Sequence, residues 1–195
     1  MNVPIFNNYI WKVTHKDKAI ENEISNLLSF CVDDKTVKSH VSSNSLYKHG
    51  THSEVNKLQI IDKYEDTIPS FVDFLYEEIG RYIQYSKWRC VDFHISQSWI
   101  NLTDIGVNQD WHNHASGHIS GVYYHDTVID NGGIIFKNPN PYAHVNIFPG
   151  LSEGIHYFPE PNTLFLFPSW MEHKTDKNKV DKIRTSISFD VLTYM

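Results

Sequence analysis

A succession of short β-type runs in the C-terminal half constrains the fold more than any other feature of this sequence. After Trp88, such runs follow one another and are separated by glycine, asparagine and proline. The runs are Val91–Leu102, Ile119–His125, Gly133–Phe136, His144–Phe148, Ile155–Phe158, Thr163–Phe167 and Arg184–Leu192. Many short strands joined by turns are typical of a β-sandwich or jelly roll.

The N-terminal part has helical periodicity instead. Residues 18–30 place Ile20, Ile24, Leu27 and Leu28 on one stripe, and a second helix is predicted from Ile68 to Tyr85. A first strand is expected within residues 3–11, and residues 34–56 are expected to form a surface loop or a lid. We therefore predict a mainly β fold with flanking α-helices, in which the N-terminal helices pack on one sheet. A single domain is expected over 1–195, with supporting elements in 1–88 and the β core in 89–195.

Composition excludes several classes of protein. The formal net charge is −6 and the chain has no basic run, so nucleic-acid binding is not expected. No apolar stretch reaches the roughly 18 residues that a membrane helix requires, and no signal peptide opens the chain. Two cysteines, Cys31 and Cys90, cannot form a disulfide framework. These features favour a cytoplasmic protein without a membrane partner.

A His-x-His pair is the first chemical signal. Residues i and i+2 of an extended strand point the same way, so His112 and His114 could share one ligand. Neutral imidazoles bind zinc, iron, copper or nickel. In a chain with 12 histidines such a pair can also be a polar strand end on the surface.

Two further signals follow along the chain. His173 lies just beyond the apolar run Leu164–Phe167, where it could be a metal ligand or a structural group. The run from Arg184 to Val191 alternates, with polar residues on one face and Ile187, Phe189 and Val191 on the other. Such a polar face can be exposed to solvent, but an inward-facing Arg184 beside Ser186 would form a receptor for a carboxylate.

Taken in order, these residues resemble the 2-oxoglutarate and Fe(II)-dependent oxygenases, and in particular a small oxygenase family common in marine bacteria and phages. The resemblance rests on Ser98–Asn101, His112–His114, Ser120–Tyr124, Gly133–Phe136, Pro161–Trp170, His173 and Arg184–Phe189. A more distant similarity to prolyl hydroxylases covers the Tyr-Tyr and Gly-Gly strands and the spacing from His173 to Arg184. The resemblance to the oxygenases implies a double-stranded β-helix, also described as a jelly roll or cupin-like fold. It also suggests that a phage could encode the enzyme.

The resemblance also implies a site. His112 and His173 would bind Fe(II), and Arg184 with Ser186 would bind the distal carboxylate of 2-oxoglutarate. Tyr124 and Asn101 are candidates for further contacts with this co-substrate. The second co-substrate implied by the resemblance is O2. The implied reaction is hydroxylation of a peptidyl, amino-acid or small-molecule substrate with release of succinate and CO2.

One departure from the usual pattern concerns the third iron ligand. The common triad is two histidines and one carboxylate, whereas the middle position here is His114. We expect His114 to bind the metal, which would leave the site one unit more positive. A carboxylate from Asp110 or Asp126 remains an alternative, as does an open ligand position.

Two other classes of function remain open. Three histidines also serve zinc enzymes and iron enzymes of the thiol dioxygenase type that use no 2-oxoglutarate. A jelly roll can also be a binding module without catalysis. A dicarboxylate receptor at Arg184 and Ser186 would distinguish the oxygenase from the other metalloenzymes, and retention of Fe(II) would distinguish it from a binding module.

Overall fold

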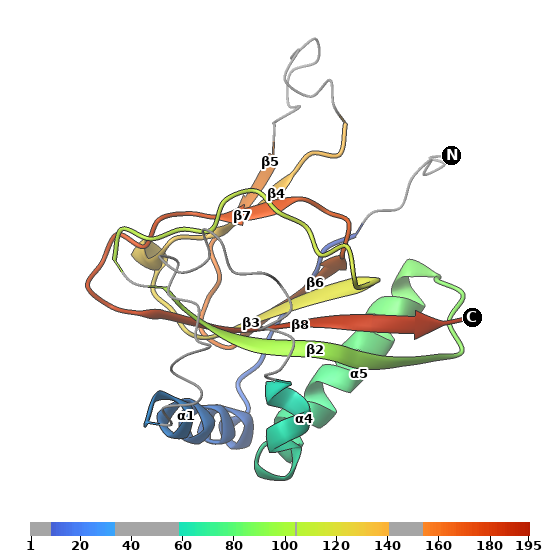
Figure 1. Cartoon of the computed structure of the whole chain (residues 1–195), viewed down its shortest axis with the longest axis horizontal. Coiled ribbons are helices and arrows are strands. Elements are labelled where there is room, and N and C mark those ends of the chain that lie inside the picture. The colour runs from blue at the N-terminus through green and yellow to red at the C-terminus, as the bar shows by residue number, and fades with distance from the viewer. Residues whose placement is uncertain (1–8, 34–58, 104, 141–153) are drawn as a thin grey trace.

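Two antiparallel sheets and a layer of helices form the molecule (Figure 1). The computed structural model describes residues 9–33, 59–103, 105–140 and 154–195. The larger sheet has the strand order β1-β6-β3-β8-β2, and the smaller one has the order β5-β4-β7. The strands of the larger sheet are β1 (Trp11–Thr14), β2 (Asp92–Thr103), β3 (Ile119–Asp126), β6 (Thr163–Pro168) and β8 (Arg184–Tyr194). Those of the smaller sheet are β4 (Ile134–Lys137), β5 (Gly154–Tyr157) and β7 (His173–Thr175).

The helices cover one face of the larger sheet, and the smaller sheet lies on the opposite side (Figure 1). They are α1 (Lys18–Asp33), α4 (Ile60–Tyr64) and α5 (Pro69–Ser86), with the short 3-10 turns η1 (Glu65–Thr67) and η2 (Ile129–Asn131). Pro69 begins α5, where its missing N–H and fixed φ are tolerated. Lys87 ends this helix in a left-handed conformation. Within the described part of the chain, no helix is both long and apolar enough to cross a membrane.

The larger sheet carries a hydrophobic core on its helix-facing side. Phe71, Leu75 and Ile79 of α5 pack there with the buried side chains of β8 that alternate toward them, such as Ile187 and Phe189. A second, smaller cluster fills part of the space between the two sheets and includes Tyr124 and Phe136. Because successive residues of a strand point to opposite faces, β8 contributes its apolar residues to the helix side and its polar residues to the space between the sheets.

The predicted fold class is confirmed, and most predicted elements lie within a few residues of the observed ones. The predicted helices 18–30 and 68–85 correspond to α1 and α5. The expected strand His144–Phe148, the N-terminal residues 3–6 and the segment 34–56 lie outside the described residues. The single domain over 1–195, with supporting elements in 1–88 and the β core in 89–195, stays a prediction.

Two elements were not anticipated. Helix α4 has five residues, too few for a helical period to show, although Ile60 and Ile61 are buried. Strand β7 has three residues, and its His-Lys-Thr sequence lacks the apolar alternation on which a strand prediction depends.

Candidate metal centre

Three histidines gather between the two sheets. One potential ligand atom from each of His112, His114 and His173 lies within 4.8 Å of the others. Their ring centroids are 4.2 to 5.4 Å apart. Among the described residues, this is the group of histidine, cysteine and acidic side chains that could hold a metal ion.

Backbone pairing positions two of these rings. The N–H of His112 donates to the carbonyl of His173 at 3.0 Å, and the reverse bond measures 2.9 Å. This exchange is an isolated bridge rather than part of a longer ladder. The extended strand that we expected for the His-x-His pair is therefore reduced to one bridge residue, and a loop with a turn follows it. The loop is held at His114, whose N–H donates to the carbonyl of Ser169.

Each imidazole has an acceptor at Nδ1. The Nδ1 of His112 lies 2.8 Å from the carbonyl of Asp110, and that of His173 lies 3.0 Å from the carbonyl of Met171. The Nδ1 of His114 lies 2.9 Å from a carboxylate oxygen of Asp190. Because all three acceptors lack hydrogen, each neutral ring carries its proton on Nδ1 and its lone pair on Nε2, through which it would bind a metal.

Electrostatics favour the neutral form at His173. Burial is the main cause that holds its pKa well below the ordinary value, and the neighbouring His112 and His114 act in the same direction. Only 5% of the residue is exposed. A neutral imidazole in a water-poor site is a metal ligand that needs no prior loss of a proton.

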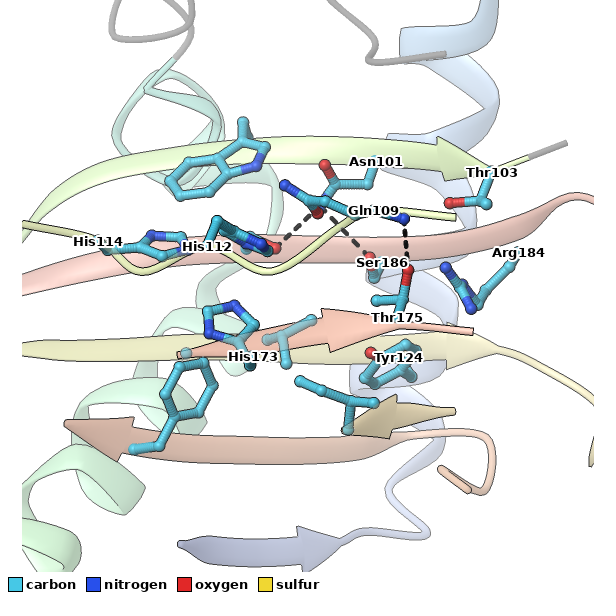
Figure 2. Close-up of a pocket in the computed structure, with 16 residues that line it drawn as sticks. Asn101, Thr103, Gln109, His112, His114, Tyr124, His173, Thr175, Arg184 and Ser186 are labelled. Carbon is cyan, nitrogen blue, oxygen red and sulfur yellow. Dashed lines mark hydrogen bonds between the residues drawn. The ribbon is translucent and has the colours of Figure 1, made fainter. Parts of the chain in front are cut away.

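A cationic side chain lies at the other end of the same pocket. Figure 2 shows the histidines at the left of the view and Arg184 at the right, with Thr175 and Tyr124 between them. Arg184 is 3% exposed, and one of its guanidinium nitrogens donates to the carbonyls of Asn131 and Asp176. No carboxylate of the described residues lies within ion-pair distance of it. Among the described residues, the buried charge therefore has no ion-pair partner, and the Asp176 carboxylate acts on it only at longer range.

Polar side chains surround this cation. Tyr124 is 2% exposed, and burial raises the pKa of its phenol, so that the hydroxyl stays protonated and can donate a hydrogen bond. Asn101 lies opposite Ser186 on the neighbouring strand and donates to the hydroxyls of Ser186 and Ser188, at 3.4 and 2.9 Å. All seven predicted site residues therefore line one pocket, whose lining comprises Trp99, Asn101, Thr103, Gln109, His112, His114, Gly121, Val122, Tyr124, Ile134, Phe167, His173, Thr175, Arg184, Ser186 and Ser188.

The carboxylates of the two alternative ligands lie outside the three-histidine group. A carboxylate oxygen of Asp110 accepts a hydrogen bond from the N–H of Trp111. Asp126 forms an ion pair with Lys182 at 2.8 Å, and its side chain is 59% exposed. Neither belongs to the group of potential ligand atoms around the three histidines.

Sequence reasoning missed Gln109 and Thr175. Thr175 lies two residues after His173 on β7, so both side chains point the same way. Its hydroxyl accepts a hydrogen bond from the N–H of Gln109 at 2.9 Å. The His-x-Thr spacing was a usable signal for Thr175, whereas Gln109 is brought in by a loop that has no sequence pattern.

Comparison with known proteins agrees with this geometry. Residues 97–190 match the model of a family described as "Putative 2OG-Fe(II) oxygenase". Together with the fold, this match indicates a 2OG-Fe(II) oxygenase. The donor set of the pocket fits the cofactors of such an oxygenase, because three imidazoles suit Fe(II) and the buried arginine suits an anionic co-substrate. No curated protein matches the chain.

Solved structures with the oxygenase fold resemble it at low sequence identity. An oxidoreductase of the 2OG-Fe(II) oxygenase family from Burkholderia pseudomallei is 13% identical, with a TM-score of 0.50, over 65% of this chain and 58% of that one. The alpha-ketoglutarate-dependent epimerase SnoN from nogalamycin biosynthesis is 11% identical, with a TM-score of 0.60, over 95% and 78%. A prolyl-4-hydroxylase from Pseudomonas putida is 15% identical, with a TM-score of 0.54, over 95% and 88%. The likeness supports the predicted jelly-roll fold of the oxygenase.

Proposed function

We propose that this chain is an Fe(II)- and 2-oxoglutarate-dependent dioxygenase that hydroxylates a C–H bond of a peptidyl, amino-acid or small-molecule substrate. The observation that carries the proposal is the pairing of two sites in one pocket. A three-histidine group lies at one end, and at the other lies a buried Arg184 that forms no ion pair with any described residue. A ligand that reaches both must bind a metal and also carry an anionic group. A keto acid with a second carboxylate meets both requirements.

In this proposal each side chain has a separate task. His112, His114 and His173 hold Fe(II) through Nε2, and Arg184 binds the distal carboxylate of 2-oxoglutarate. The protonated Tyr124 hydroxyl donates a further hydrogen bond, while Asn101 orients Ser186. The bound iron, 2-oxoglutarate and O2 supply the oxidising chemistry, with release of succinate and CO2. The apolar wall of the pocket, which includes Val122, Ile134 and Phe167, limits access of water.

A second hollow gives the substrate a route to the metal. It is lined by Trp88, Arg89, His114, Ala115, Gly117, His118, Trp170, Thr193 and Met195. Thr193 lies beyond Asp190 along β8, so this hollow is at the opposite end of the strand from Arg184. Trp170 is 50% exposed there, and an exposed indole beside a metal pocket is suited to contact an organic substrate. Co-substrate and substrate would therefore approach His114 from opposite sides.

The test is anaerobic addition of Fe(II) and then 2-oxoglutarate to the apo protein, with the visible spectrum recorded. Chelation of the keto acid by iron gives a weak metal-to-ligand charge-transfer band, and we expect it to bleach on addition of O2 as succinate forms. Iron binding without the band would favour a three-histidine enzyme that uses no 2-oxoglutarate. Failure to retain iron would favour a zinc enzyme or a binding module.

Arg184→Gln isolates the co-substrate end of the pocket. We expect this variant to retain iron but to bind 2-oxoglutarate roughly 10- to 150-fold more weakly, because hydrogen bonds to charged groups contribute about 1.5–3 kcal/mol. Ser186→Ala removes a neutral partner and should have a smaller effect in the same direction. Unchanged 2-oxoglutarate affinity in Arg184→Gln would contradict the assigned receptor.

A further inference from the structure

We propose that Asp190 completes the metal centre from behind His114, by fixing its Nδ1–H tautomer and by supplying the negative charge that a third histidine ligand lacks. This inference rests on the proposed function, because it requires that His114 binds the metal. It assigns a positioning role to a residue that would touch neither the metal nor the co-substrate.

The carboxylate of Asp190 is held firmly. One of its oxygens lies 2.9 Å from Nδ1 of His114 and accepts a hydrogen bond from Ser120 at 2.7 Å. Ser120 lies directly opposite Asp190 on β3, and its hydroxyl also contacts that of Ser169 at 2.8 Å. The side chains of Asp190 and His114 are 3% and 11% exposed. Such a network has little freedom to rearrange.

Burial makes this charge costly unless a cation is near. A carboxylate transferred from water to a protein interior loses several kcal/mol of hydration, which hydrogen bonds alone offset in part. Among the described residues, no lysine or arginine pairs with Asp190, and its basic contact is His114. A divalent metal on the far side of the same imidazole would provide the missing positive charge.

The hydrogen-bond acceptor at Nδ1 is of a different kind at His114 than at the other two histidines. His112 and His173 face neutral backbone carbonyls, whereas His114 faces a charged oxygen. His114 also occupies the place at which the common triad has its carboxylate. Three neutral imidazoles plus the Asp190 carboxylate have the same formal charge as two imidazoles plus one carboxylate ligand. The charge is therefore kept and moved one imidazole away from the metal.

The local structure explains how the pair forms. Asp190 continues the polar face of β8 that also carries Arg184, Ser186 and Ser188. The loop after His114 passes close to this face at Gly117, where a Cβ would lie 2.8 Å from Ser169 Oγ and 3.1 Å from Asp190 Cβ. A side chain at Gly117 would therefore require the loop to shift away from Asp190. His114 is also stacked on Trp99, with ring centroids 5.5 Å apart.

The experiment compares Asp190→Asn, which keeps the size but removes the charge, with Asp73→Asn. Asp73 is exposed on α5 and gives a matched loss of one charge on the helix layer. Fe(II) affinity is measured anaerobically by competition with a chromophoric chelator. We expect Asp190→Asn to bind Fe(II) about 10- to 100-fold more weakly, as is usual for the loss of an outer partner of a metal ligand. Asp73→Asn should bind like the wild type.

Two additional measurements separate charge donation from a purely structural role. With 2-oxoglutarate bound, the charge-transfer band of Asp190→Asn should move to shorter wavelength, because a less electron-rich iron gives up an electron less readily. In a His114→Asp background the third ligand is itself a carboxylate, so Asp190→Asn should cost no further affinity. A structural role would cost the same in both backgrounds. If Asp190→Asn alone does not fold, Ser120→Ala provides a milder test, because it removes the hydrogen bond from Ser120 to the Asp190 carboxylate.

The outcomes are distinguishable. A wild-type protein that binds no iron would contradict the proposed function itself. A wild-type protein that binds iron and shows the band, together with an Asp190→Asn variant of equal affinity and unshifted band, would overturn only the role of Asp190. Equal losses in the His114 and His114→Asp backgrounds would do the same.

Discussion

The two faces of strand β8 differ in their surroundings, because alternate residues of the strand face the hydrophobic core and the pocket. On the helix side, Ile187, Phe189 and Val191 are fully buried in the larger hydrophobic core. On the other side, Ser186, Ser188 and Asp190 are almost as buried but are surrounded by polar groups. Burial alone therefore does not separate core from site in this molecule. The number of hydrogen-bonding partners and the presence of unpaired charge do.

The largest expected effect is on the site face of the fold, at His173. His173→Ala removes one of three ligands and an inward-facing ring, so we expect loss of bound iron and of 2-oxoglutarate turnover beyond the roughly 100-fold cost of losing an outer partner. Iron content and succinate formation are the measurements. The neighbouring Glu172→Gln is the control, because its exposed ion pair with Lys137 contributes at most about 1 kcal/mol to stability. Retention of iron by His173→Ala would show that the comparison between the two faces is wrong.

The core face is tested by Phe189→Ala. Phe189 is fully buried, and its loss should lower the free energy of unfolding by about 3–5 kcal/mol. The side chain of the adjacent Ser188 points to the pocket. Ser188→Ala removes a hydroxyl that accepts a hydrogen bond from Asn101, so it should lower the free energy of unfolding by about 1 kcal/mol. Chemical denaturation of the two variants measures the difference. Similar losses for both would remove the distinction drawn between the faces.

A pair of glycines sharpens the same comparison with opposite signs. A Cβ at Gly121 on β3 would overlap the ring of Phe189, so Gly121→Ala should destabilise the protein by about 1–3 kcal/mol. A Cβ at Gly80 in α5 meets nothing within 4 Å. Gly80→Ala should therefore stabilise the helix by about 0.5–1 kcal/mol. A shift of both melting temperatures in the same direction would contradict the packing described.

The smallest expected effect concerns pH and a polar network near α1. His15 bonds to Tyr123, and His125 bonds to Ser25. Burial is the main cause that lowers the pKa of both histidines. The unfolded chain then binds more protons than the folded chain below the ordinary histidine pKa of about 6.5, so stability falls as the pH falls through this range. Denaturation of the His15→Gln variant at several pH values should show a weaker dependence than the wild type.

The strand pattern and the residues that line the candidate site could both be predicted from particular parts of the sequence. Alternation in the sequence of β8 places Arg184 and Ser186 on one face and Ile187 and Phe189 on the other. The apolar run before His173 located β6, since a fully buried strand is nearly all hydrophobic. Both signals depend on local sequence, which is why they were readable. The roles assigned to the predicted site residues stay predictions until they are measured.

The contacts behind His114 could not be predicted in this way. Asp190 meets His114 only because a loop after residue 111 folds back over β8, and its path depends on Gly117 and on a bond to Ser169. The same is true of the carbonyls of Asn131 and Asp176 that hold Arg184, since backbone groups leave no trace in sequence. Long-range pairing, not residue type, decides these contacts.

Strand β8 also fixes a distance within the molecule. It holds Arg184 at one end and Asp190 six residues further on, a rise of roughly 20 Å along the strand, in a register fixed by neighbours on both sides. In the proposed function, backbone spacing therefore fixes the separation between Arg184 and the Asp190 carboxylate that contacts His114. We expect a keto acid one carbon shorter than 2-oxoglutarate to bind more weakly, because it would reach the iron and the arginine less well at the same time. The protein would then select its co-substrate by the length of the carbon chain of the keto acid.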